Sequence, residues 1–337
     1  MKKSAAVTWE NRAVDRIQNH SPDLPYTDLD REIWQNELES FVPHRIFDAH
    51  THFWSNDFVL PETVCSSDWL QHETDGKILQ RLSSVLYPGR ECDFLTFAQP
   101  VVGADYDRLN RWVASEAKAF SGQSRTAMLI SRETPAGVID SMVRECGFAA
   151  LKPYYLSALP CAKGIRSYFT PEQMDVADGL NLAVVLHCRS GIAEDVEELL
   201  QYTVRFPHIR WILAHCGAAY NPKGISSAIR RLADRPGIWF DTSGICETYP
   251  QAVLLKYFDR KRILFGSDNA LGTGGCRRGR VTAYANSVLW FKQTEHATFW
   301  LYEQLRAMQR ACELMELSAS ETEDIFYRNA VRLFGLE

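Results

Sequence analysis

Five apolar segments, each short enough for a buried β-strand, end in residues that can bind a metal ion or an anion. Continuous apolar runs of this length are typical of parallel strands covered on both faces by helices. In a parallel barrel the active site lies at the carboxyl ends of the strands, so these end residues would meet there. They are the pair His50 and His52, then Lys152, His187, His215 and Asp268.

Strand-like and helix-like segments alternate along most of the chain. The expected strands cover residues 45–50, 93–98, 126–130, 148–152, 182–187, 209–215, 238–242 and 262–267. Between them lie segments with helical spacing, and Thr170 followed by Pro171 is a typical helix start. Eight alternations predict an α/β fold of the closed (β/α)8 TIM-barrel type. A doubly wound sheet is the alternative, although no Gly-x-Gly-x-x-Gly motif follows any strand.

The first 44 residues predict a helical arm in front of the barrel. Two segments with helical spacing, 8–20 and 28–41, are separated by a breaker that contains two prolines. We therefore divide the chain into an arm, 1–44, and a barrel domain, 45–337. A long insertion, 54–91, follows the first strand, and a helix is expected within it over 68–86.

Composition is that of an ordinary globular protein. The net charge of −5 over 337 residues excludes a nucleic-acid binder of the basic-patch kind. We expect no secretory signal and no membrane span, because no apolar stretch is long enough. The nine cysteines are scattered and never form a Cys-x-x-Cys pair, which favours reduced thiols in the cytoplasm. The expected partner is a small-molecule substrate, and a homo-oligomer is compatible with the sequence.

The pair His50 and His52 is the strongest local signal for a metal site. Side chains two residues apart in a strand lie on the same side, so the two imidazoles converge on one point. Two imidazoles make an incomplete site, and the other strand ends supply further ligand types. The remaining histidines lie in polar or helical contexts and are not expected to bind metal; they are His20, His44, His72, His208 and His296.

Six segments carry a family resemblance: 47–54, 186–188, 206–217, 240–244, 264–268 and 325–336. They resemble the amidohydrolase superfamily, in the amidohydrolase 2 branch of metal-dependent hydrolases with a TIM-barrel fold. The resemblance implies one divalent metal, with zinc expected and manganese, iron or cobalt as alternatives, and a second metal stays open. The implied metal ligands are His50, His52, His187 and Asp268.

The resemblance also implies roles for two further residues. His215 would lie near the metal and polarise the substrate, or join a second metal. Lys152 stands where binuclear relatives carry a carboxylated lysine that bridges two metals. The alternative is an uncarboxylated lysine that orients an anionic substrate, which we favour.

The expected reaction is hydrolysis of a C–N or C–O bond in a small, anionic amide, cyclic amide or lactone by metal-activated water. Asp268 would take the proton of that water, and His215 would steady the oxyanion. The alternatives are non-oxidative decarboxylation or hydration of a small carboxylic acid, and a non-catalytic barrel used for binding. Candidate substrate-binding residues are Trp54, Arg132, Tyr154, Arg166, Arg189 and Arg277, the last in a Gly- and Arg-rich loop, 269–280.

Overall fold

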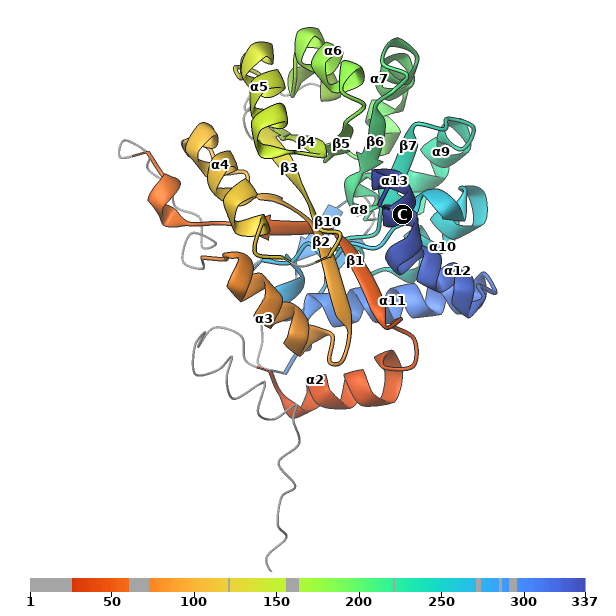
Figure 1. Cartoon of the computed structure of the whole chain (residues 1–337). Coiled ribbons are helices and arrows are strands. Elements are labelled where there is room, and N and C mark those ends of the chain that lie inside the picture. Colours follow the sequence, from red (N-terminus) through yellow and green to blue (C-terminus); the bar gives the residue numbers. More distant parts are fainter. Residues whose placement is uncertain are drawn as a thin grey trace, which may run out of the picture.

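The computed structural model describes residues 26–60, 73–120, 122–155, 164–220, 222–270, 274–284, 287–290 and 296–336. Eight parallel strands follow one another in chain order around the molecule and form the predicted barrel (Figure 1). They are β1 (Arg45–Phe53), β2 (Glu91–Ala98), β3 (Arg125–Ile130), β4 (Ala150–Pro153), β5 (Ala183–Leu186), β6 (Arg210–Leu213), β7 (Ile238–Asp241) and β8 (Ile263–Leu264). Ala49 N donates to Phe265 O at 2.9 Å, and Asp268 N donates to His50 O at 2.9 Å, which joins the last strand to the first.

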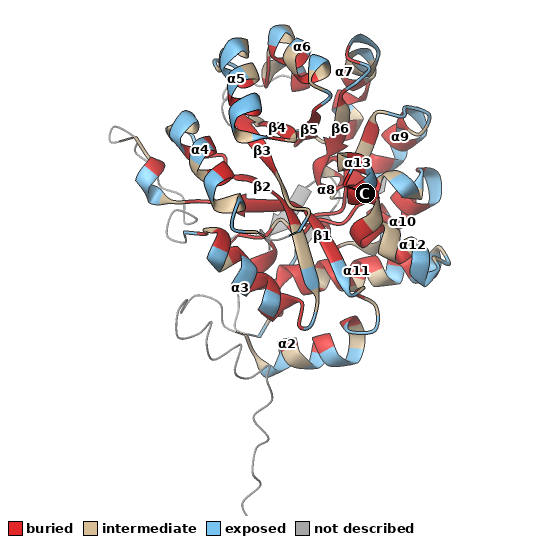
Figure 2. Cartoon of the chain, viewed as in Figure 1, coloured by how far each residue is buried: buried red, intermediate tan, exposed pale blue. Residues whose placement is uncertain are grey.

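Helices surround the strands, with buried faces toward the barrel and exposed faces outward (Figure 2). They are α3 (Gly76–Leu86), α4 (Tyr106–Ala117), α5 (Ala136–Cys146), α6 (Pro171–Gly179), α7 (Ile192–Arg205), α9 (Pro222–Leu232), α10 (Thr248–Tyr257), α11 (Trp300–Leu314), α12 (Ala319–Glu323) and α13 (Asn329–Phe334). Short helical turns are η2 (Asn56–Phe58), η5 (Ile165–Ser167), η6 (Arg260–Arg262), η7 (Gly274–Cys276) and η8 (Asp324–Arg328). The predicted start of α6 is confirmed, since Thr170 and Gln173 form a capping box ahead of Pro171. None of the described helices is long and apolar enough to cross a membrane.

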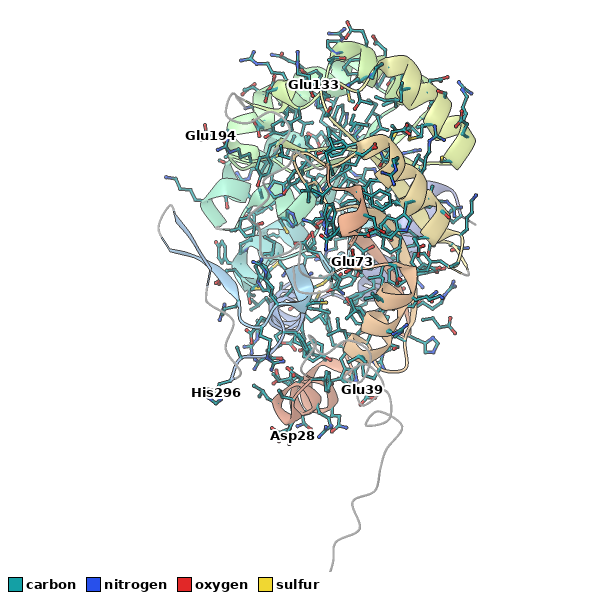
Figure 3. All side chains as sticks on the ribbon, turned by 90° about the vertical axis from the view of Figure 1, so that its left-hand side faces the viewer. Asp28, Glu39, Glu73, Glu133, Glu194 and His296 are labelled. Atoms are coloured by element: carbon teal, nitrogen blue, oxygen red, sulfur yellow. The ribbon has the colours of Figure 1, made fainter. Side chains whose placement is uncertain are left out.

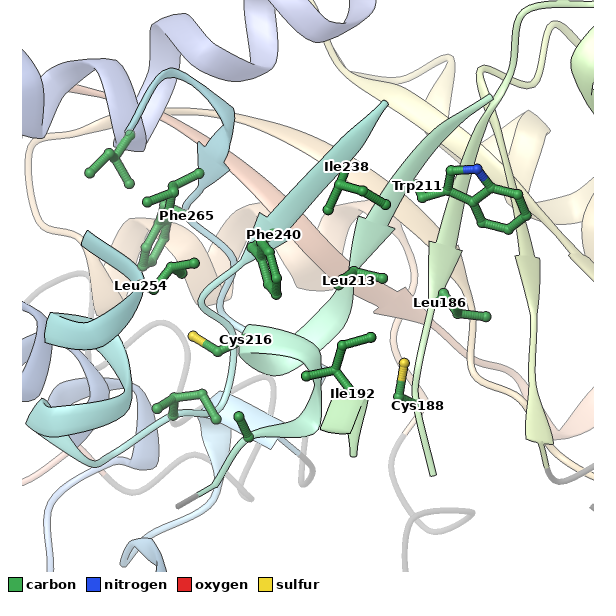
Figure 4. Close-up of a cluster of buried hydrophobic side chains, with 14 of the residues drawn as sticks. Leu186, Cys188, Ile192, Trp211, Leu213, Cys216, Ile238, Phe240, Leu254 and Phe265 are labelled. Atoms are coloured by element: carbon green, nitrogen blue, oxygen red, sulfur yellow. The ribbon is translucent and has the colours of Figure 1, made fainter. Parts of the chain in front are cut away.

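Two apolar layers hold the barrel together, and neighbouring strand residues alternate between them. Trp211 and Leu213 of β6 point outward to the helices, as does Leu186 of β5 (Figure 4). Ile212 and Val185 point inward with a set of small residues that keeps the interior narrow. The buried alanines of this inner layer are Ala49, Ala127, Ala150, Ala183, Ala214 and, from α13, Ala330.

One end of the barrel is closed by the last helix. Phe334 of α13 stacks on Phe47, near the start of β1, with ring centroids 5.8 Å apart. Val331 and Leu333 belong to the same inner apolar layer. The amino-terminal end of the barrel is therefore packed, and the carboxyl end of the strands remains for the site.

The arm is helical where the structure describes it. The expected helix over 28–41 is observed as α2 (Asp28–Ile33), which runs directly into one π-helical stretch, η1 (Trp34–Leu38). Both lie at one end of the molecule, below α3 and α11 in Figure 1. The expected helix over 8–20 falls outside the described residues. The division of the chain at residue 44 stays a prediction.

Several expected boundaries need correction. The insertion helix begins at Gly76 and not at 68, because Asp75 caps it by accepting from Ile78 N; residues 61–72 lie outside the described part. Strand β6 ends at Leu213, not His215, since the chain turns into α8 (Ala214–Ala218) through left-handed residues. Beyond β8 a hairpin of β9 (Val281–Tyr284) and β10 (Ser287–Trp290) was not predicted.

Candidate metal centre

The carboxyl ends of β1 and β8 bring His50, His52 and Asp268 together. Asp268 Oδ1 lies 3.3 Å from His50 Nε2 and 3.1 Å from His52 Nε2. Ligand atoms at about 2.0–2.1 Å from a tetrahedral zinc ion are about 3.3 Å apart, so this spacing fits a shared divalent ion. The ring of Phe97 packs under both imidazoles, at 4.9 and 4.7 Å between centroids.

The backbone around Asp268 is held in an uncommon conformation by β1. Asp268 has a φ of 61°, in the left-handed region that non-glycine residues rarely adopt. His52 N donates to Asn269 O at 2.9 Å, on the residue that follows Asp268. On the preceding residue, Ser267 N donates to the buried carboxylate of Asp48 at 2.8 Å. These bonds aim the Asp268 side chain at the histidine pair.

Asp241, at the end of β7, is a site residue that the sequence analysis did not single out. Its Oδ2 accepts from His50 Nδ1 at 2.9 Å, while Oδ1 accepts from the N–H groups of His215 at 2.9 Å and Ser243 at 3.0 Å. A carboxylate can only accept, so Nδ1 of His50 carries the proton and Nε2 presents its lone pair toward Asp268. The signal was present in the sequence, since Asp241 ends the apolar run 238–240.

His215 lies in the turn that follows β6. Its φ is 56°, and Cys216 and Gly217 after it also have positive φ. Nδ1 lies 3.0 Å from the carbonyl oxygen of Ser243 and 2.9 Å from Ser243 Oγ. Because a carbonyl only accepts, Nδ1 is protonated and the neutral ring carries its lone pair on Nε2. The ring centroid is 4.8 Å from that of His50.

His187, directly after β5, packs against the ring of His215. Its ring is 4.8 Å from that of His215, and 5.3 and 5.1 Å from those of Tyr154 and Tyr155. Within the described residues, two groups have potential ligand atoms within 4.8 Å of one another. They are His50, His52 and Asp268, and His50, His215 and Asp241, so His187 is a neighbour of these groups and not a member.

The electrostatics suit neutral imidazoles around an ionised carboxylate. Burial, with the nearby Lys152, lowers the pKa of His50 to about 3. Burial also lowers the pKa of His52. Burial alone would raise the pKa of Asp268, but the contacts with His52 and the nearby His215 and His50 hold that pKa well below the usual range. Neutral imidazoles and a carboxylate are the protonation states that a divalent metal requires.

Lys152, at the end of β4, is buried within the same end of the barrel. Its Nζ lies 4.6 Å from the centroid of the Phe97 ring and 5.6 Å from that of Tyr154. No hydrogen-bond acceptor contacts Nζ within the described residues. Burial lowers the pKa of this amine to about 8, although Asp241 and Asp268 oppose the shift.

Some of the predicted substrate residues lie near the proposed metal centre, and others do not. Tyr154 lies against the ring of His187, and the guanidinium of Arg189 is 5.8 Å from the Tyr155 ring, so both lie near the site. Trp54, two residues after His52 in the sequence, is buried, and its Nε1 donates to Asn56 Oδ1 at 3.1 Å. Arg277 is partly exposed in the loop after β8.

The other two predicted arginines are occupied elsewhere. Arg132 donates to the carbonyl oxygens of Arg166 and Phe169, both at 2.7 Å. Arg166 is exposed and pairs with Glu198 at 3.5 Å. Sequence position alone placed them on loops, but it did not show that Arg132 binds backbone oxygens between β4 and α6 or that Arg166 pairs with a glutamate of α7.

Comparisons with known proteins agree with this architecture. A family model described as Amidohydrolase matches residues 47–336. No curated protein matches the sequence.

Solved structures of similar fold include 4-oxalomesaconate hydratase from Rhodopseudomonas palustris, 18% identical, with a TM-score of 0.56 over 86% of this chain and 95% of that one. A second is 2,6-dihydroxybenzoate decarboxylase from Rhizobium, 13% identical, with a TM-score of 0.54 over 87% and 99%. A third is the dihydroxybenzoic acid decarboxylase from Polaromonas sp. JS666 with bound manganese and 2-nitroresorcinol, 14% identical, with a TM-score of 0.54 over 87% and 98%.

Proposed function

The chain belongs to the amidohydrolase family of metal-dependent enzymes, and on this premise we propose that it binds one divalent metal at the carboxyl end of its barrel. The observation that carries the proposal is that His50 Nε2 and His52 Nε2 both lie within 3.3 Å of Asp268 Oδ1. His187, the fourth proposed ligand, lies beside this group and would complete it. Zinc is the expected ion, and manganese is the first alternative because the Polaromonas decarboxylase carries it.

The donor set fits such an ion without rearrangement of the hydrogen bonds. Asp241 keeps the proton of His50 on Nδ1, so the metal-facing nitrogen is free to coordinate. When bound, the metal supplies a Lewis acid that lowers the pKa of a water molecule and polarises a substrate oxygen. The remaining steps belong to side chains of this chain.

We propose that these side chains hydrolyse a C–N or C–O bond of a small anionic amide, cyclic amide or lactone. Asp268 accepts the proton of the attacking water and returns it to the leaving nitrogen or oxygen. His215 is held with its proton on Nδ1, so it polarises a substrate carbonyl only as the imidazolium. As the neutral ring, its Nε2 accepts a proton or joins the metal.

The anionic group of the substrate would be held on the side of Lys152. The buried Nζ has no acceptor within the described residues, so a carboxylate of the substrate would supply the missing counter-charge. Tyr154 lies against this amine, and Arg189 and Arg277 would contribute from the loops. The second reading, a carboxylated Lys152 that bridges two metals, remains the alternative for this residue.

A second candidate reaction is non-oxidative decarboxylation or hydration of a small carboxylic acid. The similarity to two decarboxylases and a hydratase favours it, and so do the aromatic rings beside His187 and Lys152. Both reactions use the same ligand set, and the difference lies in which substrate bond faces Asp268. Membership of an enzyme family argues against the barrel used only for binding.

The cellular setting that we propose is the cytoplasm. In the described part of the chain the cysteines at 92, 146, 188, 216, 246, 276 and 312 are free thiols, as expected for a reducing compartment. A small molecule is the proposed partner.

The test has two parts. Protein purified without added metal should hold about one divalent ion per chain by elemental analysis, and His52→Ala should lose it, while the surface variant His208→Ala should not. A panel of lactones, amides and aromatic carboxylic acids then separates hydrolysis from decarboxylation by the product formed. Stoichiometric metal in His52→Ala would refute the proposed centre.

A further inference from the structure

A buried ion pair connects the arm to the loop that follows β8. Arg278 Nη1 lies 2.9 Å from Asp30 Oδ2, and Nη2 lies 3.3 Å from Asp30 Oδ1. The exposed fractions of the two side chains are 3% and 0%. Asp30 belongs to α2 of the arm, before the first residue that the family model matches. In Figure 3 the labelled Asp28 and Glu39 mark the two ends of the arm helices, at the lower end of the view.

The remaining hydrogen-bonding capacity of Asp30 is also used. Thr27 donates to Asp30 Oδ2 from its backbone N at 2.7 Å and from its hydroxyl at 2.8 Å. Thr298 Oγ1 donates to Asp30 Oδ1 at 2.7 Å, and the guanidinium of Arg278 stacks 4.9 Å from the Phe299 ring. Because the loss of hydration offsets much of the attraction in a buried pair, this pair is weak evidence for added stability, whereas its hydrogen bonds define the geometry of the contact.

The same loop is attached to the residue that we propose as ligand and base. Gly275 N donates to the backbone oxygen of Asp268 at 3.3 Å. Cys276 Sγ lies 3.5 Å from Asn269 Oδ1, on the next residue of the chain. Farther along, Gly279 N donates to Thr298 O at 2.8 Å. The loop is thus fixed at one end by Asp268 and Asn269 and at the other by the surroundings of Asp30.

Strand β1 also holds the backbone at Asp268. Asp268 N donates to His50 O, and His52 N donates to Asn269 O. That support acts on the backbone N of Asp268 and on Asn269. The carbonyl of Asp268 is contacted from the loop, through Gly275. A residue with positive φ needs both of its peptide groups restrained if the side chain is to keep one direction.

We propose that Asp30 is a positioning residue for Asp268, and that the arm thereby completes the metal centre from outside the barrel. The ion pair with Arg278 holds the loop 274–280, and the loop holds the peptide of Asp268 in its left-handed conformation. The inference rests on the proposed metal centre for its consequence, but the coupling between Asp30 and the loop can be measured without metal.

The test compares Asp30→Asn with a control in the same arm. Glu37→Gln removes another ion pair of the arm, which joins Glu37 to Arg306 of α11 at 2.8 Å and includes no residue of the loop 274–280. Asp30→Asn should weaken Mn²⁺ binding, titrated by water proton relaxation, by at least about fivefold, the lower end of typical coupling between sites. It should also speed hydrogen exchange at Gly275 and Gly279 in the metal-free protein. Glu37→Gln should leave the Mn²⁺ affinity within twofold of the wild type and both exchange rates unchanged.

A second pair of variants covers the case in which Asp30→Asn does not fold. Arg278→Lys keeps the positive charge but cannot form the bidentate contact with Asp30. Thr298→Val removes one hydrogen bond to Asp30. Each should give a smaller shift in the same two quantities. Folded variants with wild-type Mn²⁺ affinity and wild-type exchange at both glycines would overturn the proposal. If the wild type binds no Mn²⁺ or Zn²⁺, the proposed metal centre fails, while the exchange rates still decide whether Asp30 holds the loop.

Discussion

Asp241 and His50 are 191 positions apart in the chain, and their side chains form a buried hydrogen bond of 2.9 Å. The same carboxylate also accepts from the backbone N of His215 at 2.9 Å. One residue of β7 therefore fixes the ring orientation of a histidine on β1 and the turn that carries a histidine after β6. Partners of this kind commonly control metal affinity without touching the metal.

Asp241→Asn should weaken metal binding by about 10- to 100-fold, the usual cost of losing an outer hydrogen-bond partner. If the amide turns its NH₂ group toward His50, Nδ1 must accept and the ring proton moves to Nε2, which blocks coordination. If it turns its oxygen toward His50, the NH₂ group faces the N–H groups of His215 and Ser243, which are donors as well, and the turn that carries His215 loses its acceptor. Zn²⁺ affinity measured by competition with a chromogenic chelator checks this. Asp178→Asn is the matched control, because Asp178 makes the same contact with the exposed His208 at 3.0 Å. Equal Zn²⁺ affinity in the two variants would contradict the assignment.

Asp268→Asn should separate binding from chemistry. The amide oxygen can still approach the metal, but it cannot take a proton from water. We expect metal to be retained at reduced affinity and turnover of whichever substrate the panel identifies to fall by at least about a hundredfold. Metal content and kcat measured on the same preparation check both points. Undiminished kcat would show that another group is the base.

Lys152→Met tests the two readings of the lysine. If the amine is an ammonium, its removal takes a positive charge away from the histidine pair, so metal affinity should stay equal or rise. Affinity for an anionic substrate should fall, and KM should rise more than kcat falls. Elemental analysis should give one metal per chain before and after the change. Two metals in the wild type and fewer in Lys152→Met would instead establish a carboxylated bridge.

The variant Asp195→Asn should differ from the wild type in Tm by an amount that depends on pH. Burial, with Glu198 and Glu194 nearby, raises the pKa of Asp195 from 3.8 to about 6. Between these values the folded protein holds a proton that the unfolded chain releases, so this group makes stability fall as pH rises through that window. The Tm of Asp195→Asn should therefore exceed that of the wild type above about pH 6 and match it below about pH 4.

The control for Asp195 is Asp175→Asn, at an exposed position of α6. Its Tm difference from the wild type should not change in the same pH window. Thermal melts of the three proteins at pH 4, 6 and 8 are sufficient. A Tm gain for Asp195→Asn that is equal at all three values would point to packing and not to the proton.

The features that the sequence predicted well are those that depend on neighbours in the chain. Apolar runs located β1 to β8, and the spacing of His50 and His52 placed both on one side of β1. Thr170 and Pro171 located the start of α6 because a cap is a local hydrogen-bond pattern. The barrel follows from repetition of such local signals, so it could be inferred without knowing any contact.

The missed features depend on partners far away in the chain. Gln304 of α11 accepts from Gly244 N at 2.9 Å and donates to Gly266 O at 2.7 Å, which ties together the loops after β7 and β8. Nothing near Gln304 in the sequence indicates this. The positive φ of His215 was equally hidden, since a histidine rarely adopts it and tertiary contacts must impose it.

The positive φ angles of His215 and Asp268 limit the thermal stability that this enzyme can reach. Each such residue costs the folded state about 1–3 kcal/mol, which glycine would not incur. Substitutions that relax these two turns would therefore raise resistance to heat and remove the imidazole or carboxylate in the same step. Stabilised forms obtained by selection for activity should keep both residues and carry their improvements elsewhere, in the outer helices and surface loops. At these two turns the proposed chemistry and the stability of the fold therefore make opposite demands on the residue type.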